Sequence, residues 1–117
     1  MNTHKDLDVW KKSIEFVTEL YIVTKTFPEE EKYGLTNQLR RASISIPSNI
    51  SEGAARKGKL EFKQFLYISL SNAAELETQL IIAKNLNFIT NDSYTDLINK
   101  LNTISKMIQG LLKSLKV

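Results

Sequence analysis

The sequence predicts an all-α protein, an antiparallel up-down-up-down four-helix bundle made by a single domain over residues 1–117. Apolar residues recur at steps of three and four along four long segments, which is the spacing of one helix face. The chain has only 4 Gly and 2 Pro, so few positions interrupt a helix. No stretch of useful length alternates apolar and polar residues as a half-buried strand does.

The first helix is expected from about Asp6 or Asp8 to Thr26. Either aspartate can cap its start and suits the positive end of its dipole. The pair Phe27–Pro28 ends it, because the residue before a proline avoids the helical region. The acids at 29–31 then suit the first turn of a short helical piece. The predicted apolar face of the first helix comprises Val9, Trp10, Ile14, Phe16, Val17, Leu20, Tyr21 and Val23.

The second helix is expected from about Leu35 to Glu52, with Pro47 inside it. This proline removes one amide donor and clashes with the carbonyl of Ser43. Two outcomes are open: a kink at Pro47, or a break after which Ser48 caps a new turn. The kink is favoured because the apolar phase continues from Ile46 to Ile50.

Gly53 is the expected terminator of the second helix, and residues 54–58 form the clearest exposed loop. The third helix is expected from about Lys59 to Leu86, with apolar residues at alternating steps of four and three. The small side chains of Ser69 and Ala73 on this seam predict a close approach by a neighbouring helix.

Residues 85–91 are expected to form a turn, with helix caps offered between Thr90 and Ser93. The fourth helix follows from about Ser93 to Leu115. Gly110 lies inside it and costs about 1 kcal/mol against alanine, so it is interpreted as permitting a close contact. The predicted seam of the fourth helix comprises Tyr94, Leu97, Leu101, Ile104, Ile108, Leu111 and Leu115.

The formal net charge is only +3, but the charge is distributed unevenly. Residues 39–63 hold six basic and two acidic side chains. One interpretation is a solvated basic loop; the other is a surface that binds the phosphates of a nucleic acid. The residues predicted to bind nucleic acid are Arg40, Arg41, Arg56, Lys57, Lys59 and Lys63.

A polar stripe runs along the second helix at helical spacing and is predicted to form a structural network that fixes helix register. We expect Asn49 to satisfy the carbonyl group that Pro47 leaves without a donor. We expect Glu52 to pair with Arg56 or Lys59. The predicted network comprises Gln38, Ser45, Asn49 and Glu52.

Arg40 and Arg41 are neighbours in the sequence, so their side chains point about 100° apart on a helix. Only one of them can easily serve a pair inside the bundle. The other is then available to a phosphate or to a neighbouring subunit. Glu75 on the third helix is the expected partner, facing Arg41 or Arg40 across the bundle.

The residues needed for catalysis are largely missing. The chain has no cysteine, and His4 is its only histidine, so neither a thiolate nucleophile nor a serine–histidine relay is expected. No glycine-rich phosphate loop occurs. We therefore predict no catalytic residue, no metal site, no cofactor and no enzymatic activity. The first residues lack a signal-peptide pattern and no 18-residue apolar stretch occurs, so a cytoplasmic location without membrane contact is expected.

Three stretches carry a resemblance to a known family: DLDVWKKSIEFVTELY, TFPEEEKYGLTNQLRRASISIPSNISEGAAR and FKQFLYISLSNAAELETQL. In their order, and in the FP, YGL, QLRRA, SIPSNI and ELETQL signatures, they resemble the bacterial four-helix bundles called 23S rRNA intervening-sequence proteins. The resemblance covers about Asp6 to Ala83. It supports the predicted bundle fold. A related protein is the accessory protein of diversity-generating retroelements.

The resemblance implies a homopentamer around a central channel. It also implies a link to RNA, because family members are often encoded within insertions of large-subunit ribosomal RNA genes. The leading hypothesis is a non-enzymatic homo-oligomer associated with rRNA or another RNA through its basic surface. The alternative is a protein–protein adaptor or scaffold ring that binds no nucleic acid and contacts a reverse transcriptase or another protein.

Overall fold

Four α-helices form the protein in the computed structural model, which describes residues 4–115 apart from the side chain of Asp6. They are α1 (Asp8–Thr24), α2 (Leu35–Ala54), α3 (Lys59–Asn85) and α4 (Asn91–Ser114). Two short 3-10 helices, η1 (His4–Asp6) and η2 (Glu29–Glu31), precede α1 and α2. Residues 4–115 contain no strand, and the predicted all-α four-helix bundle is confirmed.

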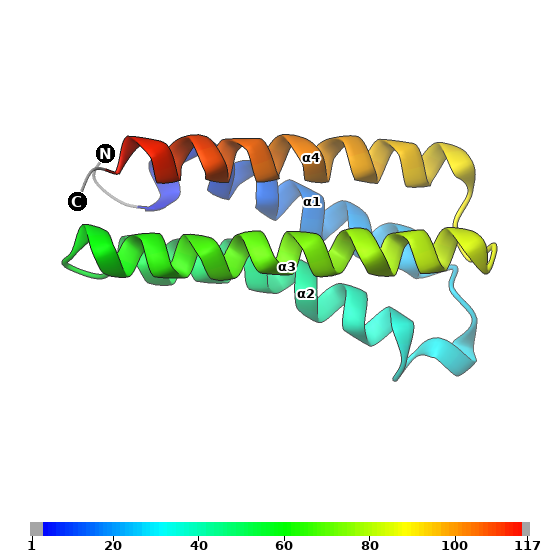
Figure 1. The fold of residues 1–117 in the computed structure, drawn as a ribbon. Helices are drawn as coiled ribbons and strands as arrows, with labels where there is room; N and C mark the ends of the chain where they lie inside the picture. Colours follow the sequence, from blue (N-terminus) through cyan, green and yellow to red (C-terminus); the bar gives the residue numbers. More distant parts are fainter. Residues whose placement is uncertain (1–3, 116–117) are drawn as a thin grey trace.

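Each helix packs against two others and the bundle is elongated, with extents of 44 × 24 × 20 Å. Figure 1 shows the chain reversing direction from one helix to the next. Within the described residues no Cα atom of α1 lies within 8 Å of one in α3, and the same holds for α2 and α4, so these pairs are diagonal. The α2–α3 turn lies at the same end of the bundle as the start of α1 and the end of α4 (Figure 1).

The core draws on all four helices, as the apolar spacing predicts. Full burial of one large apolar side chain, such as Leu, Ile or Phe, contributes about 1.5–3 kcal/mol to the free energy of unfolding. Most seam positions of α4 are buried, whereas Ile14 of the predicted α1 face is 40% exposed. The largest fully buried side chains are Phe16, Leu20, Leu39, Ile46, Ile50, Leu66, Leu76, Leu80, Leu97, Leu101, Ile104 and Ile108.

The closest helix packing joins α2 to α3. Ser69 is fully buried, and its hydroxyl donates a hydrogen bond of 3.0 Å to the carbonyl of Ile46 on α2. A Cβ added at Gly53 would lie only 2.7 Å from the Cβ of Phe65. The prediction that Gly53 ends the second helix is therefore wrong. This glycine is buried inside α2, which continues to Ala54, and it is needed for the approach of α3.

The helix is continuous across Pro47, which is itself buried. The alternative of a break with a new turn capped by Ser48 is therefore excluded, and the kink at Pro47 stays a prediction. Proline is tolerated here because the surrounding packing, including Ile46 and Ile50 at 0% exposure, outweighs the loss of one backbone hydrogen bond.

Helix ends differ by a few residues from the prediction. α1 begins at Asp8, and its N-cap residue is Leu7, with no side-chain cap hydrogen bond, so Asp8 is not a cap. The expected cap of Asp6 lies outside the described side chains. The prediction of a cap near Thr90 is confirmed, because its hydroxyl oxygen accepts a hydrogen bond of 3.1 Å from the amide of Ser93.

Gly110 does not permit a close contact, contrary to the prediction. It is exposed on α4, and a Cβ added there would have no neighbouring atom within 4 Å. The core-facing positions around it, Ile108 and Leu112, lie on the opposite side of the helix. Its cost to helix stability is therefore not offset by packing in the described chain.

Candidate nucleic-acid interface

The α2–α3 turn gathers four of the six residues predicted to bind nucleic acid. Arg56, Lys57 and Lys59 are exposed, and Lys63, the fifth residue of α3, is half-buried. Lys113, near the end of α4, is exposed at the same end of the bundle (Figure 1). These five residues are called the basic end below.

Among the described residues, Arg56 is the one member of the basic end that pairs with acidic side chains. Its guanidinium lies 3.2 Å from a carboxylate oxygen of Glu52 and 4.0 Å from one of Glu61. It also lies over the ring of Phe65, 5.1 Å from the centroid. Exposed ion pairs of this kind contribute only about 0–1 kcal/mol, so a phosphate can replace these partners at small cost. The expected pair between Glu52 and Arg56 is thereby confirmed.

Arg40 is anchored to α1 rather than turned toward solvent. Its Nε donates to the hydroxyl of Thr24 at 2.9 Å, and its Nη2 donates to the carbonyl of Tyr21 at 3.3 Å. The guanidinium also stacks on the Tyr21 ring, 4.5 Å from the centroid. Arg41 is exposed instead, in line with the prediction that only one of the two can serve inside the bundle.

Arg40 and Arg41 do not lie next to the basic end. Arg41 lies 13 residues before Ala54, the last residue of α2, which corresponds to roughly 20 Å at about 1.5 Å per residue. The predicted nucleic-acid set is thus two separate groups. The sequence suggested one patch because the count of basic residues in a segment does not show how far apart their side chains lie on the folded surface.

The predicted polar network is smaller than expected. The amide nitrogen of Asn49 donates to both the carbonyl and the hydroxyl of Ser45, each at 2.8 Å. Asn49 therefore does not serve the carbonyl that Pro47 leaves without a donor, because its side chain reaches back to its own helical turn. Within the described part of the chain, Glu52 is exposed and pairs with Arg56 only, and the exposed Gln38 makes no hydrogen bond with Asn49 or Ser45. The result is one local Asn49–Ser45 contact rather than a buried network.

A polar groove of about 380 Å³ lies between α2 and α3. Arg41 and Glu75 both line it, so the expected facing of these two residues is present, although no ion pair joins them within the described chain. Glu75 instead accepts a hydrogen bond of 3.2 Å from the side chain of Gln79 on its own helix. The other lining residues are Asn37, Gln38, Ala42, Ser45 and Asn72.

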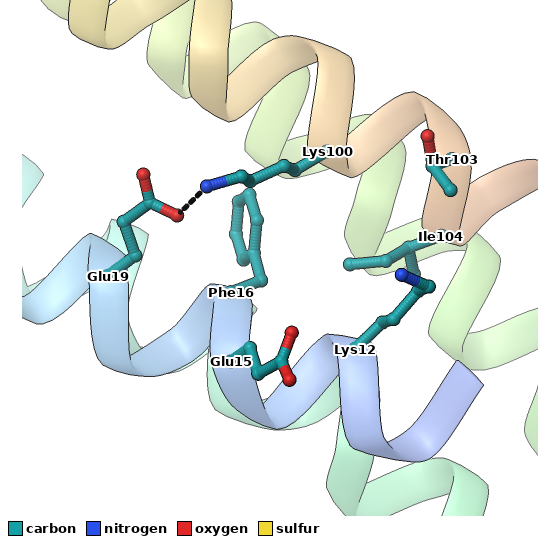
Figure 2. A pocket seen from close by; sticks show the side chains of 7 residues that line it. All are labelled: Lys12, Glu15, Phe16, Glu19, Lys100, Thr103 and Ile104. Atoms are coloured by element: carbon teal, nitrogen blue, oxygen red, sulfur yellow. Dashed lines mark hydrogen bonds and ion pairs between the residues drawn. The ribbon is translucent and has the colours of Figure 1, made fainter. Parts of the chain in front are cut away.

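A second pocket, of about 150 Å³, lies between α1 and α4 and was not anticipated from the sequence. Figure 2 shows the Phe16 ring reaching from α1 toward α4, where Ile104 completes the apolar floor. Lys12 and Glu15 of α1 line the opening (Figure 2). The sequence carries no specific signal for this pocket, because charged residues at steps of three and four, such as Lys12, Glu15 and Glu19, are typical of any solvated helix face.

Glu19 and Lys100 of this pocket form one charged cluster with Asp96, which lies just outside it. The Nζ of Lys100 lies 2.6 Å from Glu19 and 3.1 Å from Asp96. Burial raises the pKa of Glu19 above its ordinary 4.5, and a hydrogen bond with Asp96 adds to the rise while Lys100 opposes it. The hydrogen bonds with Glu19 and then Lys100 lower the pKa of Asp96 below its ordinary 3.8. On acidification Glu19 therefore takes up a proton before Asp96 does.

Neither metal binding nor membrane insertion finds support in the described residues. Within residues 4–115, no three His, Cys, Asp or Glu side chains gather as metal ligands. His4 packs edge-on against Trp10, with ring centroids 5.1 Å apart. Over the same residues, every helix falls short of the length and apolar character that crossing a bilayer requires.

Comparison with known proteins gives a family and a fold. The sequence model of the family described as 23S rRNA-intervening sequence protein matches residues 5–110. The curated proteins include no significant match. A crystal structure from Bacteroides thetaiotaomicron is similar, with a TM-score of 0.82 and 26% identity over 90% of this chain and 95% of that chain. That protein is described as one of unknown function from the S23 ribosomal protein family.

The family match and the solved structure both cover most of the bundle. The matched segment, residues 5–110, includes all of α1, α2 and α3 and most of α4. The protein therefore belongs to the 23S rRNA-intervening sequence protein family.

Proposed function

We propose that the protein is a non-enzymatic homo-oligomer that binds RNA through the basic end of its bundle. The observation that carries the proposal is the uneven charge of the two ends. One end carries Arg56, Lys57, Lys59, Lys63 and Lys113, and within residues 4–115 Arg56 alone of these five is paired with acids. The family name, with its reference to 23S rRNA, points to the same class of partner.

The opposite end of the bundle has a mixed charge, because Lys25, Lys32 and Lys84 lie there beside acidic residues. It carries the three consecutive acids of η2, Glu29–Glu31, and Asp92 in the first turn of α4. A long polyanion is attracted more strongly to the basic end, so the bundle has a preferred orientation on RNA. Lysine and arginine contacts of this kind bind phosphates and do not read sequence.

Two exposed apolar stripes support assembly with other copies of the chain. The α1 stripe consists of Ile14 and Ile22, which are 40% and 60% exposed. The α3 stripe consists of Tyr67, Ile68, Ile81, Ile82 and Leu86, each 41–55% exposed. Small exposed residues, including Ala74, lie between the two halves of the α3 stripe and allow a helix to approach closely.

The positions of the stripes favour a ring. Because α1 and α3 are diagonal in the bundle, their outer faces point to opposite sides. Two different surfaces that meet head to tail generate a closed ring when the rotation closes, whereas a two-fold dimer uses one surface twice. A pentamer, the state that the family resemblance implies, would multiply the formal charge of +3 to about +15 and place five basic ends on one face.

RNA affinity measured against salt concentration tests the proposal. We expect binding at low salt that falls steeply as salt rises, with a slope of about −0.7 for each single-strand phosphate contact. The double variant Lys57→Ala/Lys59→Ala should reduce the slope by about 1–2. Its matched control, Lys84→Ala/Lys106→Ala, removes the same charge outside the basic end and should leave the slope nearly unchanged. Equal slopes for the two variants, or no binding at low salt, would refute the role of the basic end.

A protein–protein adaptor is the second candidate function, and the exposed α3 stripe favours it. In that case the stripe contacts another protein rather than a second copy. Light scattering with Ala74→Arg separates the two roles of the stripe. Loss of a wild-type oligomer in this variant supports the ring. A wild-type monomer at micromolar concentration, together with a protein partner retained after nuclease treatment, supports the adaptor.

A further inference from the structure

A pocket of about 220 Å³ lies where α1 ends and α2 begins. Its wall carries three cationic side chains, Lys25, Lys32 and Arg40, and two hydroxyl side chains, Thr24 and Thr36. The volume is several times the roughly 30 Å³ that one water occupies in the liquid, so a tetrahedral oxyanion has room to enter. This pocket lies at the end of the bundle opposite to the basic end.

Arg40 is held in place before any ligand arrives. Its bonds to the Thr24 hydroxyl and the Tyr21 carbonyl use Nε and Nη2, and no hydrogen bond within the described residues uses Nη1. Stacking on Tyr21 fixes the plane of the guanidinium. An arginine ordered in this way loses little conformational freedom when it binds an oxyanion.

Thr36 supplies the second observation. Its side chain is 6% exposed and lines the pocket, and its hydroxyl has no hydrogen-bond partner within residues 4–115. Buried hydroxyl groups are normally paired, so this one is a donor that a ligand can satisfy once a side-chain rotation turns its fully buried oxygen toward the pocket. Thr36 is also the second residue of α2, where backbone amides have no helical acceptor and the helix dipole is positive.

Acidic groups near the pocket limit what it can bind. Glu29 lines the wall, and a carboxylate oxygen of Glu31 accepts a hydrogen bond of 3.1 Å from the amide of Leu35. Lys32 also lies near an aromatic ring, with its Nζ 5.6 Å from the centroid of Tyr33. Three cations against one wall carboxylate leave the pocket positive, so it suits an anion and not a metal cation.

We propose that this pocket binds a phosphate group, either as inorganic phosphate or as the phosphate of a monoester such as a nucleoside monophosphate. The oxyanion accepts from Arg40, from the two lysines and from the hydroxyl of Thr36. This site is separate from the basic end and does not depend on RNA binding there.

Calorimetric titration of the full chain with inorganic phosphate at constant ionic strength tests the proposal. We expect saturable one-site binding in the millimolar range or tighter, and a melting temperature that rises with phosphate. Lys25→Gln/Lys32→Gln, which alters two exposed side chains and should fold normally, should weaken binding about tenfold or more. Thr36→Val should weaken phosphate binding without lowering the stability of the phosphate-free protein, because it removes an unpaired buried hydroxyl.

Arg41→Gln is the matched control, because it removes the neighbouring guanidinium, which lies outside the pocket. Its phosphate affinity should equal that of the wild type. If adenosine monophosphate binds as tightly as inorganic phosphate, the phosphate group alone accounts for binding. If adenosine monophosphate binds more tightly, the ligand is a phosphate monoester. The proposal is overturned by no binding at 20 mM phosphate, by unchanged affinity in the two pocket variants, or by adenosine binding as tightly as its monophosphate.

Discussion

The α2–α3 interface and the α1–α4 interface are built on different principles. Over the second half of α2, small residues let the α3 backbone approach: Gly53 faces Phe65 and Phe62, and Ser69 bonds directly to the carbonyl of Ile46. The polar groove between α2 and α3 opens only beside the first half of α2. Between α1 and α4, the helices leave a pocket of about 150 Å³, and the charged side chains of Glu19 and Lys100 bridge its rim. One interface depends on shape and the other on surface electrostatics.

This difference indicates where the bundle tolerates change. Protein interiors are close-packed, so an added methyl group at the α2–α3 interface must displace its neighbours. The α1–α4 rim is open to solvent, where ion pairs contribute little and salt screens them. The α2–α3 pair also carries the basic end on its turn, so the rigid interface holds the surface proposed to bind RNA.

The largest effect is expected from Gly53→Ala. The new Cβ would lie 2.7 Å from the Cβ of Phe65 and 3.0 Å from Cδ1 of Phe62, so α3 must shift. Overpacking of this kind costs about 1–3 kcal/mol, against which alanine regains up to about 1 kcal/mol of helix propensity. We expect a net loss in the free energy of unfolding, measured by urea denaturation.

Gly110→Ala is the matched control for Gly53→Ala, since nothing lies within 4 Å of its Cβ position. This substitution should stabilise the protein by up to about 1 kcal/mol. If both glycine variants shift stability in the same direction, the α2–α3 interface is not closely packed at Gly53.

A smaller effect is expected from Ser69→Ala. This substitution removes the hydrogen bond to Ile46 and leaves a small void, at a cost of about 1 kcal/mol. Ser71→Ala, on the exposed side of α3, breaks only a hydrogen bond to Tyr67 within its own helix. It should be neutral or slightly stabilising, and chemical denaturation of both variants measures the difference. Equal losses would show that the hydroxyl of Ser69 contributes nothing across the interface.

The smallest effect is expected at the α1–α4 rim, where an NMR titration of the carboxyl groups measures it. Glu19 should titrate above 4.5 and Asp96 below 3.8. A raised carboxyl pKa in Glu19 favours the fold at low pH, and this contribution is lost as pH rises through the folded pKa. The lowered pKa of Asp96 favours the fold above its unfolded pKa, and this contribution is lost as pH falls through the folded value. The two contributions oppose each other, so the net pH dependence from this cluster should be small.

Lys100→Met should move both carboxyl groups upward in pKa, because Lys100 lowers the pKa of each. Lys106→Met, elsewhere on the exposed side of α4, should move neither. Identical titration curves for Asp96 in the wild type and in Lys100→Met would contradict a linked cluster. The effect on unfolding should also fade at high salt, unlike that of Gly53→Ala.

Much of the fold could be predicted because helix formation is local. The spacing of Leu97, Leu101, Ile104 and Ile108 predicts both a helix and its buried face, and all four are at most 1% exposed. The cap at Thr90 follows from the same local logic. The candidate site was harder to predict from the sequence. Arg40 and Arg56 belong to the same basic segment of the sequence, yet Arg40 is fixed to α1 and Arg56 lies at the α2–α3 turn.

The sequence by itself determined the four helices, the side of each that is buried, and the excess of positive charge within residues 39–63. Only the tertiary structure decided that Gly53 faces a neighbouring helix while Gly110 faces solvent, and that Thr36 and Arg40 line one pocket. The physical reason is the distance along the chain over which each feature is determined. Apolar periodicity follows from 3.6 residues per turn within a single segment, whereas close approaches and pockets depend on how separate segments cross in space.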